Sequence, residues 1–190
     1  KALYDGHAVA AVAATSASVA RKALKLIKVD YEVLPHVIDP VEAMDPKAPV
    51  LHDDMYTTGL PERPKKPSNV AKRIEIGVGD VAAGFAEADH VIEREFNTKA
   101  VHQGYIEPHA CLVSVAGDGK ATIWSSSQGQ FMVRAMCAYL TGVPQSDIRA
   151  IPAEIGGGFG GKTIVYLEPV ALVLARKSGL PVKMTMTREE

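Results

Sequence analysis

The glycine-rich segment 155–163 is the part of this sequence best suited to contact a ligand. It runs Ile-Gly-Gly-Gly-Phe-Gly-Gly-Lys-Thr, so five glycines surround a single aromatic residue. Glycine adopts backbone angles that other residues avoid, and it has no Cβ to keep backbone N–H groups away from a bound molecule. We therefore expect the glycine run, residues 156–161, to lie against a ligand.

Two phosphate-binding patterns match this segment. One is G-x-x-x-x-G-K-[ST] over residues 156–163, and the other is G-x-G-x-x-G over residues 156–161. In a P-loop, Lys162 would reach the phosphates and Thr163 would hold Mg²⁺. The context disfavours both patterns, because no aspartate ends the next expected strand and no suitably placed acidic residue follows to bind a ribose. A glycine-rich turn without any ligand is the remaining alternative.

The composition indicates a globular chain of one or two domains, with 190 residues, 47% hydrophobic content and a net charge of −1. The balanced charge gives no sign of nucleic-acid binding, and no apolar run approaches the roughly 18–20 residues of a membrane span. We expect a cytoplasmic location, with neither nucleic acid nor membrane as a partner. The chain opens inside what looks like continuing structure and ends just after an expected strand, which predicts a fragment of a longer polypeptide. Cys111 and Cys137 are expected to be small buried residues.

Hydrophobic periodicity predicts two blocks of secondary structure. In the first, a buried strand over 8–14, a helix over 16–27 and a strand over 29–33 form a β-α-β unit. Seven prolines between residues 35 and 69 predict a crossing segment that becomes a linker.

The second block begins near residue 74. It contains a short helix from Asp80 to Ala88, a strand over 90–99 and a hairpin with strands at 109–116 and 121–126. A buried helix to about residue 140, a strand over 148–155, a helix to about residue 177 and a strand over 182–187 follow. Met132 and Met136 are expected in the core.

Four segments together resemble the molybdenum hydroxylases, the xanthine dehydrogenase and aldehyde oxidase family. They are the glycine run, Ser-Ser-Gln at 126–128, Leu-Thr-Gly-Val-Pro at 140–144 and Gln-Gly-Tyr-Ile-Glu-Pro-His at 103–109. The resemblance is to the molybdopterin-binding large subunit and implies an α+β fold. Residues 1–50 would be the C-terminal part of an α/β-hammerhead domain, 51–69 a linker, and 70–190 the N-terminal part of the first molybdopterin-binding domain.

The resemblance also implies a site. The metal is held by dithiolene sulfurs of the cofactor, with no protein ligand to it, and the protein supplies the surrounding contacts. Gln128 matches the family glutamine whose side-chain amide donates a hydrogen bond to a molybdenum oxygen. The residues implied to line the cofactor are Gln128, Gly157, Gly158, Phe159 and Gly160. Thr163 is implied to line the substrate pocket. Lys162 is expected to be structural, and Phe159 is equally compatible with a core anchor.

The implied reaction is hydroxylation of an aldehyde, aromatic or heterocyclic substrate with water as the oxygen source. Electrons leave through 2Fe-2S and FAD centres on partner subunits or domains. The family's base is a glutamate beyond this chain, so no catalytic residue is expected here and the chain alone is expected to be inactive. Purine-oxidising members carry a glutamate where this chain has Thr163, which disfavours xanthine. Glu107 is expected to be a buried structural carboxylate.

Two alternatives and two further predictions accompany this interpretation. A family-like binding or scaffold module without redox activity is the main alternative, and a P-loop nucleotide-binding domain is the second. His102 and His109 lack a third ligand and are expected to be satisfied or solvent-facing rather than a metal pair. A fragment separated from its neighbours would expose apolar surface and is expected to self-associate.

Overall fold

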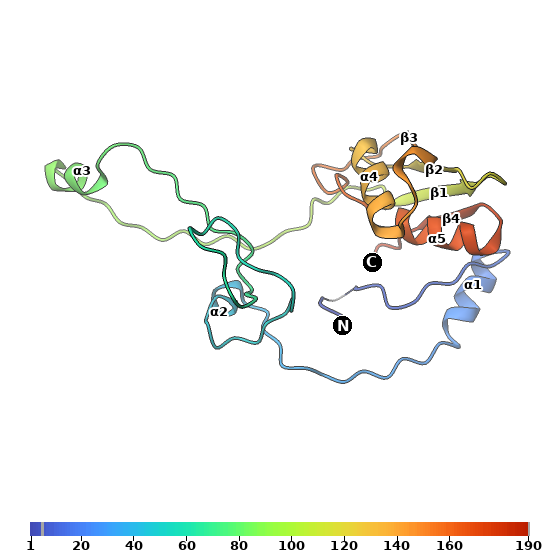
Figure 1. Ribbon diagram of the computed structural model, residues 1–190, viewed down its shortest axis with the longest axis horizontal. Helices are drawn as coiled ribbons and strands as arrows, with labels where there is room; N and C mark the ends of the chain where they lie inside the picture. The colour runs from blue at the N-terminus through green and yellow to red at the C-terminus, as the bar shows by residue number, and fades with distance from the viewer. Residues whose placement is uncertain (5, 190) are drawn as a thin grey trace. The chain divides into compact units, whose positions relative to one another are not determined.

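A computed structural model describes residues 1–4 and 6–189 (Figure 1). The chain divides into two compact units, Lys1–Lys28 with Lys99–Glu190 and, separately, Val29–Thr98. All four strands of the described chain lie in the first unit, which also contains the glycine run. The predicted domain limits at residues 50 and 70 stay predictions.

The first unit is organised around a mixed four-stranded sheet in the order β3-β2-β1-β4 (Figure 1). Its strands are β1 (Ala110–Val115), β2 (Ala121–Ser125), β3 (Ile148–Pro152) and β4 (Val182–Thr185). β1 is antiparallel to β2 and β4, whereas β2 and β3 are parallel. Gly119, at φ 86°, makes the tight β1–β2 turn possible, because a residue with a Cβ rarely adopts that angle. The predicted hairpin is confirmed.

Two helices pack against one face of this sheet and against each other: α4 (Gln130–Thr141) and α5 (Glu168–Ser178). Both end at a glycine in the left-handed region, Gly142 at φ 71° and Gly179 at φ 68°. The core between helices and sheet contains the following buried residues: Cys111, Val113, Ala121, Ile123, Val133, Cys137, Val143, Ile148, Ala171, Leu172, Ala175 and Val182. The expected α+β class is confirmed.

Both cysteines are buried in this core, as predicted. Burial raises the pKa of Cys111 and of Cys137 to about 12, so both thiols stay protonated at neutral pH. α4, in contrast, is less buried than predicted, since Phe131 is 89% and Met132 45% exposed. Only one face of the helix meets the sheet, and its other apolar residues remain outside the core.

The expected β-α-β unit near the start is wrong. Residues 17–24 do form α1 (Ala17–Leu24), but residues 8–14 and 29–33 form no strand. A strand needs a hydrogen-bonded neighbour, and none lies alongside either segment in the described chain. The strand expected over 90–99 is absent for the same reason.

The second unit contains α2 (Pro40–Ala43) and α3 (Val81–Glu87). Asp80 caps α3 by accepting a 3.0 Å hydrogen bond from the Ala83 N–H, as its position predicted. The proline-rich stretch is otherwise irregular and is held by Asn69, whose side chain bonds to the backbone of Ala43, Pro49 and Leu51. Across residues 1–4 and 6–189, no helix combines the length and the apolar character that crossing a membrane requires.

Candidate cofactor site at the glycine run

The glycine run connects β3 to the segment before α5 and contacts residues of segment 103–107 and Gln128. A Cβ added at Gly156 would lie 2.7 Å from Glu107 Cβ, and one at Gly161 would lie 2.8 Å from the Tyr105 ring. A Cβ at Gly158 would lie 2.5 Å from Gln128 Oε1. At these three of the five glycines, a Cβ would come closer to a neighbouring side chain than ordinary packing allows.

Gln128 lies three residues after the end of β2 and is held by backbone groups of Gly160 and Lys162. Its backbone N–H donates to Lys162 O at 2.8 Å, and its side-chain Oε1 accepts from Gly160 N at 3.1 Å and from Lys162 N at 3.2 Å. Backbone N–H groups only donate, so the atom that faces them is the amide oxygen. The Nε2 group, which makes no hydrogen bond within residues 1–4 and 6–189, is left as a free donor.

Phe159 is the one residue of the glycine run with a side chain. Its φ of 48° lies in the left-handed region, which is strained for an aromatic residue, and its side chain is 75% exposed. The alternative that Phe159 is a core anchor is therefore wrong. The N–H groups of Gly157, Gly158 and Phe159 bond to no group in the described part of the chain. Thr163, exposed just after the run, donates from Oγ1 to Gly160 O at 3.2 Å.

Lys162 points into the protein and has no exposed surface. Its Nζ lies 2.5 Å from Glu107 Oε2 and 4.9 Å from the centre of the Tyr105 ring. The lysine of a P-loop must instead reach the phosphates of a nucleotide. A buried, paired ammonium cannot do so, and the P-loop alternative is not supported.

Glu107 is half-buried and hydrogen-bonded, which agrees with its expected structural role. Its Oε2 also accepts from Gly156 N at 2.9 Å. Burial works to raise the pKa of Glu107, but the hydrogen bonds from Lys162 and Gly156, together with the Lys162 charge, outweigh it. The pKa of Glu107 is consequently lower than that of an ordinary glutamate, and the carboxylate is ionised at neutral pH.

His109 is buried beside this pair and is hydrogen-bonded through Nε2 to the Tyr105 hydroxyl at 2.7 Å. Its ring also packs on Tyr166 at 4.2 Å between centroids. Burial, followed by the Lys162 charge, lowers the pKa of His109, so the imidazole is neutral at pH 7. Within residues 1–4 and 6–189, no three His, Cys, Asp or Glu side chains are grouped closely enough to hold a metal ion.

Glu168 is a buried residue that the sequence analysis missed. Its Oε1 accepts from Ser125 Oγ at 2.5 Å, and its Oε2 accepts from Tyr166 N at 2.9 Å. These bonds tie the end of β2, just before Gln128, to the start of α5, just after the run. The sequence feature that could have drawn attention to Glu168 is its place in the first turn of an expected helix. An acidic residue is common there because it interacts favourably with the helix dipole, so the position alone does not indicate burial.

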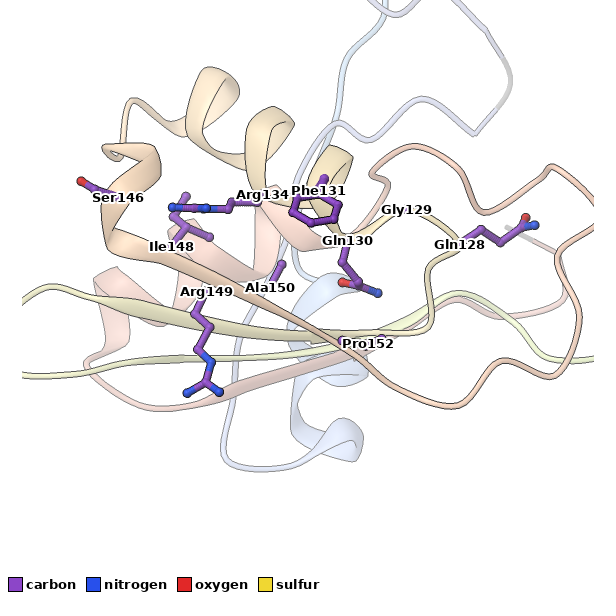
Figure 2. A pocket seen from close by; sticks show the side chains of 10 residues that line it. All are labelled: Gln128, Gly129, Gln130, Phe131, Arg134, Ser146, Ile148, Arg149, Ala150 and Pro152. Atoms are coloured by element: carbon purple, nitrogen blue, oxygen red, sulfur yellow. The ribbon is translucent and has the colours of Figure 1, made fainter.

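A cavity of about 710 Å³ lies between β3 and the first turns of α4, with Gln128 at one end. Figure 2 shows the Gln128 side chain extended away from α4, whereas Gln130 points in toward the sheet. Gln130 Nε2 donates to Ser125 O and Ser127 O. Its buried Oε1 has no partner in the part of the chain that the structure describes. The sequence did not predict this cavity.

Comparison with known proteins decides the family. The model of the family described as "Molybdopterin cofactor-binding domain" matches residues 62–190. The chain belongs to this family. The resemblance to the xanthine dehydrogenase and aldehyde oxidase group is thereby confirmed.

Several relatives of this molybdopterin cofactor-binding domain are similar over nearly the whole chain. A probable hypoxanthine oxidase of Escherichia coli strain K12 is 37% identical over 100% of the chain and 22% of its own length. The carbon monoxide dehydrogenase large chain of Afipia carboxidovorans is 36% identical over 100% of the chain and 24% of its own length. The chain thus spans less than a quarter of these two relatives.

Solved structures similar to this chain agree with this family assignment. The aldehyde oxidoreductase of Desulfovibrio gigas matches with a TM-score of 0.78 at 26% identity, covering 92% of this chain and 18% of that one. The CO dehydrogenase of Oligotropha carboxidovorans matches with a TM-score of 0.75 at 33% identity, covering 90% and 22%. The expected molybdopterin-binding domain is therefore confirmed at the level of the family.

Proposed function

We propose that this domain forms one wall of a molybdenum cofactor site in the large subunit of a hydroxylase-type oxidoreductase. The observation that carries the proposal is the fixed amide of Gln128, whose oxygen accepts from Gly160 N and Lys162 N. The amide nitrogen is then held as a donor beside a backbone without side chains. A cofactor that brings its own metal ligands needs such neutral donors from the protein.

The residues present fit a molybdopterin-type cofactor. Gln128 Nε2 and the unpaired N–H groups of Gly157, Gly158 and Phe159 offer several donors with no net charge. A Cβ added at Gly160 would have no atom within 4 Å, so the backbone there is open to close approach. Lys162, the nearby cation, is neutralised by Glu107. These groups would bind and orient the cofactor.

When bound, the cofactor would supply the redox chemistry for hydroxylation of a substrate carbon, with water as the oxygen source. The chain's own contribution is a neutral hydrogen bond from Gln128, which polarises its acceptor without adding charge. Thr163 would line the substrate pocket. The Thr163 hydroxyl donates its proton to Gly160 O. Its Oγ1 can therefore act toward a substrate only as an uncharged acceptor.

The substrate we propose is an aldehyde or an aromatic or heterocyclic compound. The names of the relatives range from hypoxanthine oxidase to aldehyde oxidoreductase, so substrate choice varies among proteins similar to this one. We further propose 2Fe-2S and FAD partners, a base outside this chain and a cytoplasmic location. Self-association of the isolated chain is supported by exposed apolar residues such as Ile38, at 93%, and Val78, at 92%.

Metal analysis of the full-length protein that carries this sequence tests the proposal. Protein purified from cells supplied with molybdate should contain about one molybdenum per large subunit, together with the fluorescence of an oxidised pterin. Protein from tungstate-grown cells is the control and should lose molybdenum. Stoichiometric pterin without turnover of any oxidisable substrate would favour a non-catalytic binding module. Absence of both metal and pterin would overturn the proposal.

Gly158→Ala should impair the site while leaving the fold intact. The added Cβ meets the far end of the flexible Gln128 side chain, which can swing away at little cost but then loses both hydrogen bonds to its oxygen. We expect turnover per molybdenum to fall about 10–100-fold, as for loss of other contacts around a metal site. The free energy of unfolding should fall by about 1–3 kcal/mol, because two hydrogen bonds are lost. Steady-state kinetics and urea unfolding measure the two effects.

Gly117→Ala is the matched control for this prediction. Gly117 lies in the β1–β2 turn of the same unit, and a Cβ there has no atom within 4 Å. Turnover should match that of the unsubstituted protein. Equal activity of the two alanine variants would contradict a role for the position of Gln128.

A further inference from the structure

We propose that Lys162 is a positioning residue whose buried ammonium, held by Glu107, aims the side-chain amide of Gln128. The inference rests on the proposed function, because it concerns the donor that Gln128 would offer to the cofactor. Lys162 is the lysine of the P-loop pattern, where it would bind phosphate, and here it receives a different role.

Every polar group of Lys162 is used. Its N–H donates to Gln128 Oε1 at 3.2 Å, and its carbonyl accepts from Gln128 N at 2.8 Å and from Ser127 Oγ at 3.0 Å. Its ammonium reaches Glu107 at 2.5 Å. The backbone of Lys162 is therefore attached to both the main chain and the side chain of Gln128, and rotation of residue 162 would displace both.

Glu107 extends the same constraint to the other end of the run. One carboxylate oxygen, Oε2, accepts from Gly156 N at 2.9 Å as well as from Lys162 Nζ. Glu107 Oε2 thus bonds both to Gly156, the first residue of the run, and to Lys162, the residue directly after the run. Residues 157–161 therefore lie between two groups that bond to the same oxygen, and Phe159 among them is 75% exposed.

A charged pair suits this task better than an apolar contact. An unpaired buried ammonium is costly, so Lys162 is stable only where its Nζ meets the carboxylate. A methionine of similar size would fill the space in several orientations. The ion pair therefore selects one backbone conformation, and its charges cancel, which leaves the surroundings of Gln128 neutral.

The test uses full-length holoenzyme carrying Lys162→Met, and the double substitution Glu107→Gln with Lys162→Met, which removes both charges together. For each, we would measure molybdenum per subunit, kcat and KM per molybdenum, and the electron paramagnetic resonance spectrum of Mo(V). We expect kcat per molybdenum to fall about 10–100-fold, with an altered Mo(V) spectrum and little change in KM. Lys120→Met is the control, because its partner Asp118 forms an exposed pair 3.0 Å away; it should behave as wild type.

The outcomes separate this inference from the proposed function. Wild-type protein without molybdenum would overturn the proposed function itself. Wild-type protein with molybdenum, whose two variants retain kcat per molybdenum and the Mo(V) spectrum, would overturn only the positioning role of Lys162. If neither variant folds, a crystal structure of the wild-type holoenzyme decides the matter: Gln128 Oε1 must accept from the N–H groups of residues 160 and 162, and a rotated amide would refute the inference.

Discussion

Glu107→Ala should lower the free energy of unfolding by about 3–5 kcal/mol, because removing one partner of a buried ion pair leaves the other charge uncompensated. The stranded charge is that of Lys162, which has no exposed surface and cannot reach water without local unfolding. The substitution also removes the acceptor of the Gly156 N–H. Equilibrium unfolding in urea, followed by circular dichroism, measures the effect.

Removing Lys162 instead of Glu107 should lower the free energy of unfolding by less. In Lys162→Met the remaining charge is on Glu107, whose side chain is 32% exposed and can be hydrated. We expect a loss of less than half that of Glu107→Ala. Asp118→Ala, which breaks the exposed pair with Lys120, is the control and should cost no more than about 1 kcal/mol. Equal losses for Glu107→Ala and Asp118→Ala would show that the buried pair contributes no more than a surface pair.

The same pair makes stability depend on pH in a defined direction. The pKa of Glu107 is lower in the folded protein than its ordinary value of 4.5. Its contribution is therefore fully present above pH 4.5 and is lost as the pH falls through the folded value. The unsubstituted protein should lose more stability on acidification than the variant with Glu107→Gln and Lys162→Met. Parallel slopes in acid unfolding would contradict this assignment.

Gln128→Ala should lower kcat of the full-length enzyme by about 10²–10³-fold, the loss typical of removing one preorganised donor from a reaction centre. Gln128→Glu isolates the donor, because a carboxylate can still accept from Gly160 N and Lys162 N but offers a second acceptor in place of Nε2. It should be as impaired as the alanine variant at neutral pH. Steady-state kinetics, normalised to molybdenum content, measure both.

Gln145→Ala is the control for this pair of variants. Gln145 is exposed in the turn before β3 and contributes only its backbone carbonyl, which accepts from Arg134. It should retain full kcat. Full activity of Gln128→Glu would mean that the free Nε2 group is not used in the reaction, and the proposed role of Gln128 would have to be abandoned.

Features that depend on a few neighbouring residues were predictable. The β1–β2 turn follows from Asp-Gly at 118–119, and the ends of α4 and α5 follow from Gly142 and Gly179, since each needs a backbone angle that glycine adopts freely. The cap of α3 by Asp80 is equally local. The strands expected near the start failed because a strand also requires a neighbour, which no local pattern supplies.

By itself, the sequence determined the α+β class, the bare backbone at residues 156–161 and, through its four matching segments, the molybdopterin-binding family. Only the tertiary structure decided which way Lys162 points and what holds Gln128. Lys162 and Glu107 are 55 positions apart, and Ser125 and Glu168 are 43 apart. Such pairs form only when the sheet and its helices bring distant segments together, so the same lysine that completes a phosphate motif in the sequence becomes a buried anchor in the fold.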